Sequence, residues 1–197
     1  MNISDEELMV EYGKGAEWAF ELLVERYQKP LINFFYRALL DKMQAEDLAQ
    51  EVFVGLFRAG RRYQPRAKFT TFLFRIAANV LASEMRKIMR RPRTVPIAEQ
   101  GAGEDEGTGV EQVEDTGPPV SARVDMSIVT NAIREAVASL PADQETAFTL
   151  RTYQGLSYEE IARVMRTPVG TVKSRIARAE RALRPKLRGI KDELAQR

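Results

Sequence analysis

Apolar residues recur along this chain at the spacing of α-helices, and almost no stretch alternates with the period of a β-strand. The stretch from Ala16 to Leu40 predicts a long helix, in which Pro30 indicates a kink or a break. Two further helices are predicted, with core-facing residues Leu48, Ala49, Val52, Phe53, Leu56 and Phe57 in the first and Phe69, Phe72, Leu73, Ile76, Ala77, Val80 and Leu81 in the second. The pattern therefore predicts an all-α protein.

One acidic segment interrupts this pattern. The residues from Glu99 to Pro119, EQGAGEDEGTGVEQVEDTGPP, are rich in Gly, Glu and Asp and contain no aromatic side chain. Such a segment buries too little apolar surface to offset the entropy of ordering, so we predict a flexible linker. The prediction is two small helical domains joined by a flexible acidic linker, with an N-terminal domain at 1–92, the linker at 93–124 and a C-terminal domain at 125–197, whose first helix begins near Ser127.

A helix-turn-helix is predicted in the C-terminal domain. In SYEEIARVMRTPVGTVKSRIARA, from Ser157 to Ala179, two helical patterns are separated by only three residues, and Ser157 with Glu160 forms a capping box. The second helix of this motif enters the DNA major groove, where Lys and Arg reach guanine edges and phosphates. Its first turns offer Thr171, Lys173, Ser174, Arg175, Ala177 and Arg178. The alternative is a solvated basic face on an ordinary helical bundle.

Charge is unevenly distributed although the net charge is only +2. Eleven bases and three acids lie between Arg151 and Lys191, and five bases without an acid lie between Arg58 and Lys68. Basic segments on both sides of an acidic one indicate polyanion binding at two places.

The absence of Cys and His removes thiolate catalysis, histidine acid–base catalysis and the common zinc sites, and we expect no cofactor.

The second basic surface has the residues of a single-strand binding site. The loop from Arg61 to Lys68 contains Tyr63, whose ring can stack on a base, and Arg66 and Lys68, which can hold phosphates. The following helix places Arg75 and Asn79 on its polar face, and the Asn79 amide can both donate to and accept from a base edge. The alternative is a solvated connector whose cations only raise general DNA affinity.

A different surface is predicted on the helix from Ala45 to Ala59. Opposite its core stripe lie Asp47, Gln50, Glu51 and Val54, so acids surround an exposed valine, which indicates a protein-binding patch. The alternative is a solvated face with a single exposed valine.

A metal-dependent nuclease built on Glu46, Asp47 and Glu51 is disfavoured, because their spacing is explained by an exposed helix face and no histidine is present. We therefore expect no metal site, no catalytic residue and no enzymatic activity.

These motifs resemble the bacterial RNA polymerase sigma factors of the extracytoplasmic-function group. GLSYEEIARVMRTPVGTVKSRIARAERAL is similar to their region 4, and DLAQEVFVGLFR followed by FTTFLFRIAANV is similar to their region 2. The resemblance implies a protein that binds core RNA polymerase and promoter DNA and is held inactive by an anti-sigma factor. It assigns Lys173, Ser174, Ala177 and Arg178 to the minus-thirty-five element, Asp47, Gln50 and Glu51 to the polymerase clamp, and Asn79 with the loop from Tyr63 to Phe72 to the minus-ten element.

A rival function is a dimeric helix-turn-helix regulator that binds a palindrome and never contacts polymerase. Such a protein needs a dimer interface or a ligand pocket, and the N-terminal pattern shows neither. The chain also begins without a signal peptide pattern and contains no run of eighteen apolar residues. We therefore expect a cytoplasmic protein that does not insert into a membrane.

Overall fold

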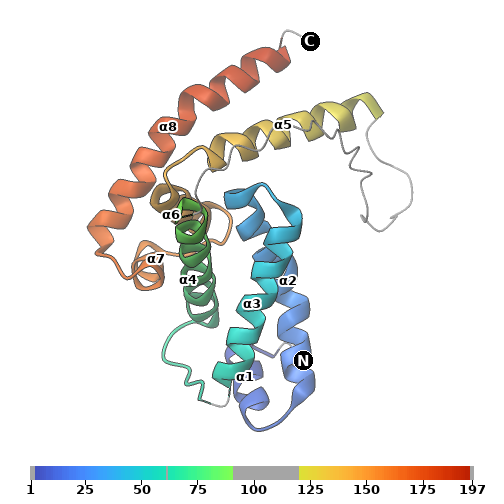
Figure 1. Cartoon of the computed structure of the whole chain (residues 1–197), viewed down its shortest axis with the longest axis vertical. Helices are drawn as coiled ribbons and strands as arrows, with labels where there is room; N and C mark the ends of the chain where they lie inside the picture. Colours follow the sequence, from blue (N-terminus) through green and yellow to red (C-terminus); the bar gives the residue numbers. More distant parts are fainter. Residues whose placement is uncertain (1–2, 61, 91–119, 196–197) are drawn as a thin grey trace.

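The computed structural model describes residues 3–60, 62–90 and 120–195, and in the last range it describes the surroundings of side chains only for residues 129–190. The described residues form helices and no strand, which confirms the predicted all-α class. The helices are α1 (Asp5–Gly13), α2 (Glu17–Leu39), α3 (Lys42–Gly60), α4 (Phe69–Arg90), α5 (Val120–Ala138), α6 (Ala142–Thr152), α7 (Tyr158–Met165) and α8 (Val169–Ala195) (Figure 1). Most of the predicted linker lies outside the described residues, and α5 begins at Val120 rather than near Ser127.

Local sequence signals set several helix boundaries. Ser4 and Glu7 form a reciprocal capping box at the start of α1, and Ser157 and Glu160 form a second one, predicted above, at the start of α7. In the second box the Ser157 N–H donates to the Glu160 carboxylate at 2.8 Å, and the Glu160 N–H donates to the Ser157 hydroxyl at 3.2 Å. Each box satisfies two N–H groups that the first helical turn leaves without partners.

The N-terminal module, α1 to α4, is built around an aromatic core. Phe34 packs edge-on against Phe35 and Phe74, with ring centroids 5.3 and 5.6 Å apart. The helix α2 runs through Pro30 without a break, so of the two alternatives predicted at Pro30 the break does not occur. Phe57 is also not a core residue: its side chain is 57% exposed and contacts the rings of Tyr12 and Phe20 at the edge of the module.

The C-terminal module, α5 to α8, contains the predicted helix-turn-helix in α7 and α8. Val172 and Ile176 of α8 are buried in the same apolar cluster as Ile161 and Val164 of α7. Further along α8, Ala179 and Leu183 pack with the end of α5 in a second cluster. The turn between α7 and α8 is closed by Arg166, whose backbone is left-handed with φ of 50°.

The two modules pack against each other, with α7 lying beside α4 and α6 near the end of α2 (Figure 1). One buried apolar cluster includes Leu73 and Ala77 of α4 together with Ile161 and Val164 of α7. Polar contacts cross the same junction: Lys68 lies 3.1 Å from the Glu160 carboxylate, and the Arg37 guanidinium stacks 3.9 Å above the ring of Tyr153. This arrangement, which we call the closed arrangement, was not predicted from the sequence.

Candidate nucleic-acid and polymerase interfaces

The first turns of α8 present a mixed set of side chains. Lys173, Ala177 and Arg178 are exposed, whereas Thr171, Ser174 and Arg175 are partly buried. The Ser174 hydroxyl donates to the Thr171 carbonyl at 2.9 Å, and Arg175 forms an ion pair with Asp143 of α6. Thus Lys173, Ala177 and Arg178 face solvent, whereas Thr171, Ser174 and Arg175 already make contacts within their own module.

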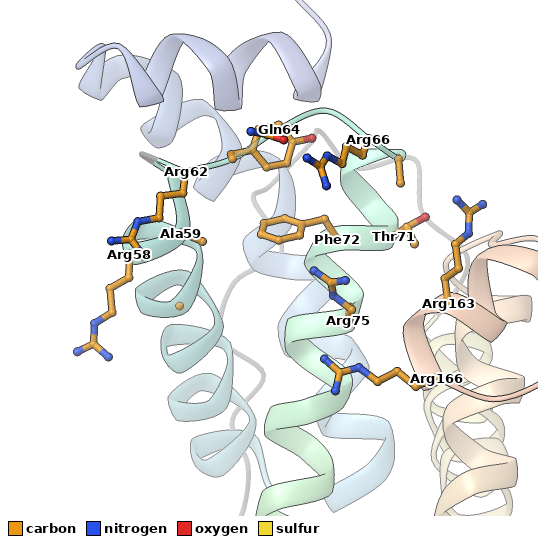
Figure 2. Close-up of a pocket in the computed structure, with 13 residues that line it drawn as sticks. Arg58, Ala59, Arg62, Gln64, Arg66, Thr71, Phe72, Arg75, Arg163 and Arg166 are labelled. Carbon is orange, nitrogen blue, oxygen red and sulfur yellow. The ribbon is translucent and has the colours of Figure 1, made fainter.

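A second candidate nucleic-acid site is an open pocket of about 890 Å³. It is lined by Gly55, Arg58, Ala59, Arg62, Tyr63, Gln64, Arg66, Ala67, Thr71, Phe72, Arg75, Arg163 and Arg166. We call it the arginine pocket (Figure 2). Among the described residues no acid lines it, so its charge is uniformly positive. A pocket of this character attracts anions, and phosphate groups suit the donor geometry of guanidinium.

Aromatic rings form the floor of the arginine pocket. Phe72 lies 5.3 Å from Tyr63, ring centroid to ring centroid, and the Arg75 guanidinium lies 5.5 Å from the Phe72 ring centre. Tyr63 is only partly exposed, and burial, with a smaller effect of the carboxylates of Glu6 and Asp5, raises the pKa of its phenol to about 12. The phenol therefore stays neutral at physiological pH, and the rings offer apolar surface beside the cations.

The structure separates the predicted single-strand residues into two groups. Tyr63, Arg66 and Arg75 meet in the arginine pocket. Lys68 instead pairs with Glu160 of α7, and Asn79 lines a smaller pocket of about 270 Å³ together with Asp143 and Arg175. The closed arrangement thus places Lys68 and Asn79 at the junction of the modules, outside the arginine pocket.

The predicted polymerase patch lies on α3. Asp47, Gln50, Glu51 and Val54 are all exposed, and the Val54 side chain is 48% exposed. Gln50 also lines a groove of about 310 Å³ between α2 and α3, whose other lining residues are Val24, Gln28, Ile32, Glu46, Ala49 and Phe53. The groove was not predicted, because its two walls come from different helices.

The described residues contain no group of three or more His, Cys, Asp or Glu side chains that could hold a metal ion. In the same residues no helix is long and apolar enough to span a membrane.

Several residues of the arginine pocket were not predicted as site residues, among them Arg58, Arg62, Arg163 and Arg166. The helical period placed Phe72 in the core stripe, yet its ring is partly exposed in the pocket. Arg163 and Arg166 belong to the C-terminal module, about ninety residues further along the chain, and enter the pocket only because α7 packs on α4. No sequence signal links these two arginines to the N-terminal module.

An exposed basic helix in a helix-turn-helix, joined to a helical module with an arginine pocket and an acidic patch, defines a DNA-binding transcription protein. The family models agree: residues 23–91 match Sigma-70 region 2 and residues 130–183 match Sigma-70, region 4. The chain is 37% identical over 188 residues to the RNA polymerase sigma-H factor of Pseudomonas aeruginosa, covering 93% of this chain and 96% of that protein. It is 34% identical over 188 residues to the ECF RNA polymerase sigma-E factor of Escherichia coli K12, covering 95% and 96%.

Solved structures share the fold. CnrH in complex with the cytosolic domain of CnrY superposes with a TM-score of 0.64 at 23% identity, covering 97% of this chain and 99% of that one. The sigma factor RpoE in complex with the anti-sigma factor NepR, from Bartonella quintana, gives 0.63 at 24% identity, covering 86% and 96%. The chain belongs to the sigma-70 family, in the extracytoplasmic-function group. It is a sigma factor, which directs RNA polymerase to initiate transcription at particular promoters, and sigma factors are initiation factors rather than catalysts.

Proposed function

We propose that the three surfaces divide the work of a sigma factor among themselves. The exposed residues at the start of α8 read the minus-thirty-five element, the arginine pocket and Asn79 hold the opened minus-ten strand, and the α3 patch docks on core polymerase. The observation that carries this assignment is spatial: Asp47, Gln50, Glu51 and Val54 are exposed on α3 but do not line the arginine pocket, and the basic start of α8 lies on another helix, so one chain can contact a protein and DNA at once.

For the minus-ten element, the pocket supplies what strand opening requires. Drawing a base out of the duplex costs a few kcal/mol, because stacking and pairing are lost. A protein must offset this free energy by stacking its own rings on the base and by contacting phosphates. Phe72 and Tyr63 offer ring surface, and Arg66 and Arg75 offer cations next to it. Asn79, which the closed arrangement places beside the C-terminal module, contacts a base once that module moves away.

The remaining assignments follow from the family. We propose that the protein acts in the cytoplasm, has no catalytic site of its own, and is restrained by an anti-sigma factor, as RpoE is bound by NepR in the solved complex. The domain boundaries at 1–92, 93–124 and 125–197 also belong to the proposal, with α5 extending the C-terminal helical region to Val120.

The test of the assignment is holoenzyme formation by a charge-reversed α3 patch. The double variant Asp47→Lys with Glu51→Lys should fail to co-purify with core polymerase, because two exposed carboxylates on one helix face become cations. A variant matched for charge, Glu135→Lys with Glu180→Lys, alters exposed acids of the C-terminal module and should still form holoenzyme. Normal holoenzyme formation by the first variant would show that the α3 face has another function and that polymerase binds elsewhere on the chain.

A further inference from the structure

The arginine pocket draws cations from both modules. Figure 2 shows Arg66 and Arg75 with their guanidinium groups turned into the space beside Phe72, and Arg166 reaching from the end of α7 across α4 toward Arg75. Like charges repel, so a junction that gathers guanidinium groups without a lining acid is unfavourable unless an anion lies between them. Because the groups belong to different modules, such an anion would bridge the modules.

Arg166 also occupies a backbone conformation that its side chain does not favour. Its φ of 50° is left-handed, a region in which Cβ is crowded and which glycine adopts freely. A helix C-terminus of this shape is usually closed by Gly. Non-glycine residues in such conformations cluster at functional sites, and here the side chain is the part that enters the pocket.

The pocket has room and donors for a small phosphorylated ligand. Its volume of about 890 Å³ lies within the range of small-molecule sites, roughly 300–1,000 Å³. The Thr71 hydroxyl of the same lining is buried and has no hydrogen-bond partner among the described residues, so one donor at the pocket wall is unpaired. One guanidinium group donates two parallel N–H hydrogen bonds to the oxygens of a phosphate. Several guanidinium groups together therefore suit a chain of phosphates better than a single phosphate.

We propose that the arginine pocket binds a short polyphosphate chain, such as that of a nucleoside triphosphate, and that this ligand ties α7 to α4 and so stabilises the closed arrangement. Binding occurs in the free protein and does not depend on the sigma assignments above. Only one consequence rests on the proposed function: the ligand and the minus-ten strand would compete for Arg66 and Arg75.

Calorimetric titration of the full chain tests the site. Tripolyphosphate and ATP, both without Mg²⁺, should bind at about 0.15 M salt, where long-range attraction is screened beyond about 8 Å. Adenosine should not bind. Arg166→Gly removes the bridging guanidinium and places glycine at a left-handed position, so the fold should be retained while affinity for both anions falls at least about tenfold. Arg75→Ala should have a similar effect.

The matched control is Arg184→Ala, which removes an exposed arginine of α8 outside the pocket and should leave both affinities within about twofold. Equal losses in Arg166→Gly and Arg184→Ala would show general attraction to a basic protein and overturn the proposal. Adenosine binding as tightly as ATP would overturn it as well, since the phosphates would then contribute nothing.

A second readout follows the modules directly. The chain has no cysteine, so Glu21→Cys on α2 with Glu180→Cys on α8 provides two exposed, uniquely labelled positions. Tripolyphosphate should increase the population at the closed distance in electron–electron double resonance, and Arg166→Gly should abolish that increase. An unchanged distance distribution at saturating tripolyphosphate would refute the bridging role. These measurements contain no polymerase, so their failure differs from a failure of holoenzyme formation.

Discussion

At the scale of single residues, the cations of α8 differ in exposure and in ion pairing, and hence in whether they can contact DNA. Lys173 and Arg178 are exposed on the first turns of α8, whereas Arg175 lies between them and pairs with Asp143. An arginine that is paired within its own module stabilises the packing of its helices, and this ion pair must break before the arginine can contact a phosphate. The sequence alone treated these three cations as equivalent, because helical spacing does not reveal which neighbour the other helices supply.

Replacing either exposed cation should weaken recognition of the minus-thirty-five element. For Lys173→Ala and Arg178→Ala we expect a loss of ~1–3 kcal/mol where the contact reaches a base edge. The measurement is transcription by holoenzyme from a promoter that depends on its upstream element, with Arg184→Ala as the control. Full activity of both variants on that promoter would exclude this helix face as the reader.

Glu145 of α6 is a buried carboxyl group whose ionisation opposes folding. Its side chain accepts a hydrogen bond from the Thr149 hydroxyl at 2.8 Å, but burial dominates and raises the pKa of Glu145 from 4.5 to about 7. Hydrogen bonds from Thr149 and Thr146 and the charge of Arg37 act in the opposite direction. Because the folded state holds this proton more tightly, the free energy of unfolding should decrease as pH rises from about 4.5 to 7.

Glu145→Gln should remove that decrease. At pH 8 the variant should be more stable than the parent by roughly 3 kcal/mol at most, and near pH 4.5 the two should agree, because the parent carboxyl is then protonated when folded. Urea unfolding at both pH values measures the difference. Exposed Glu159→Gln is the control for changing one charge in the same module. An equal effect at both pH values would mean that Glu145 stabilises the fold through its shape instead.

At the scale of elements, α1 acts as a clamp on the start of α4. The Glu6 carboxylate accepts a hydrogen bond from the Phe69 N–H at 2.6 Å, at the positive end of the α4 dipole. Next to it, Asp5 pairs with Arg26 and accepts from the Tyr27 hydroxyl, and the Tyr27 ring lies 5.2 Å from that of Phe69. These contacts fix the point where the arginine-rich loop becomes a helix.

Loss of this cap should therefore destabilise the N-terminal module. For Glu6→Ala we expect about 1 kcal/mol less stability, the usual cost of removing a helix cap. Glu11→Ala, in the same helix but paired only with Lys14 at the surface, should change stability by less. Urea denaturation of both variants measures the difference, and an effect of Glu6→Ala no larger than that of Glu11→Ala would show that the hydrogen bond contributes nothing net.

The elements themselves were largely predictable, because their causes are local. The capping residues Ser157 and Glu160 and the apolar stripe of α8 predict the helix-turn-helix without knowledge of any other part of the chain. Errors arose where tertiary contacts decide. Helical period alone assigned Phe57 to the core, but Phe57 is 57% exposed, and its ring packs only at the edge of the module against Tyr12 and Phe20.

At the scale of the whole molecule, the docking of the two modules was beyond the reach of the sequence pattern. The apolar residues of α4 and α7 could belong to two separate cores or to one shared core. Their spacing along the sequence is the same for both alternatives and does not distinguish them. The contact between Lys68 and Glu160 joins residues more than ninety positions apart, and their charges are common surface charges. Such pairs become visible only when both helices are placed.

In the closed arrangement the two proposed DNA surfaces lie too close together to contact both promoter elements at once. Arg166 lines the arginine pocket, and Lys173 at the start of α8 follows it by only seven residues, which span at most about 25 Å even when fully extended. The minus-thirty-five and minus-ten elements lie roughly 25 base pairs apart, which is about 85 Å of B-form DNA at 3.4 Å per base pair. The modules must therefore separate on the promoter, and the roughly thirty residues between Arg90 and Val120 can reach at most about 100 Å when fully extended.

We therefore expect the spin labels at positions 21 and 180 to move apart by several tens of ångströms when holoenzyme binds promoter DNA. Separation breaks the contact between Lys68 and Glu160 and moves the C-terminal module away from Asn79, which lines a pocket with Asp143 and Arg175 in the closed arrangement. Core polymerase without DNA is the comparison that shows whether protein binding alone separates the modules. Initiation with the labels still at the distance of the free protein would contradict the distance argument, and one of the two DNA surfaces would then have to be assigned elsewhere.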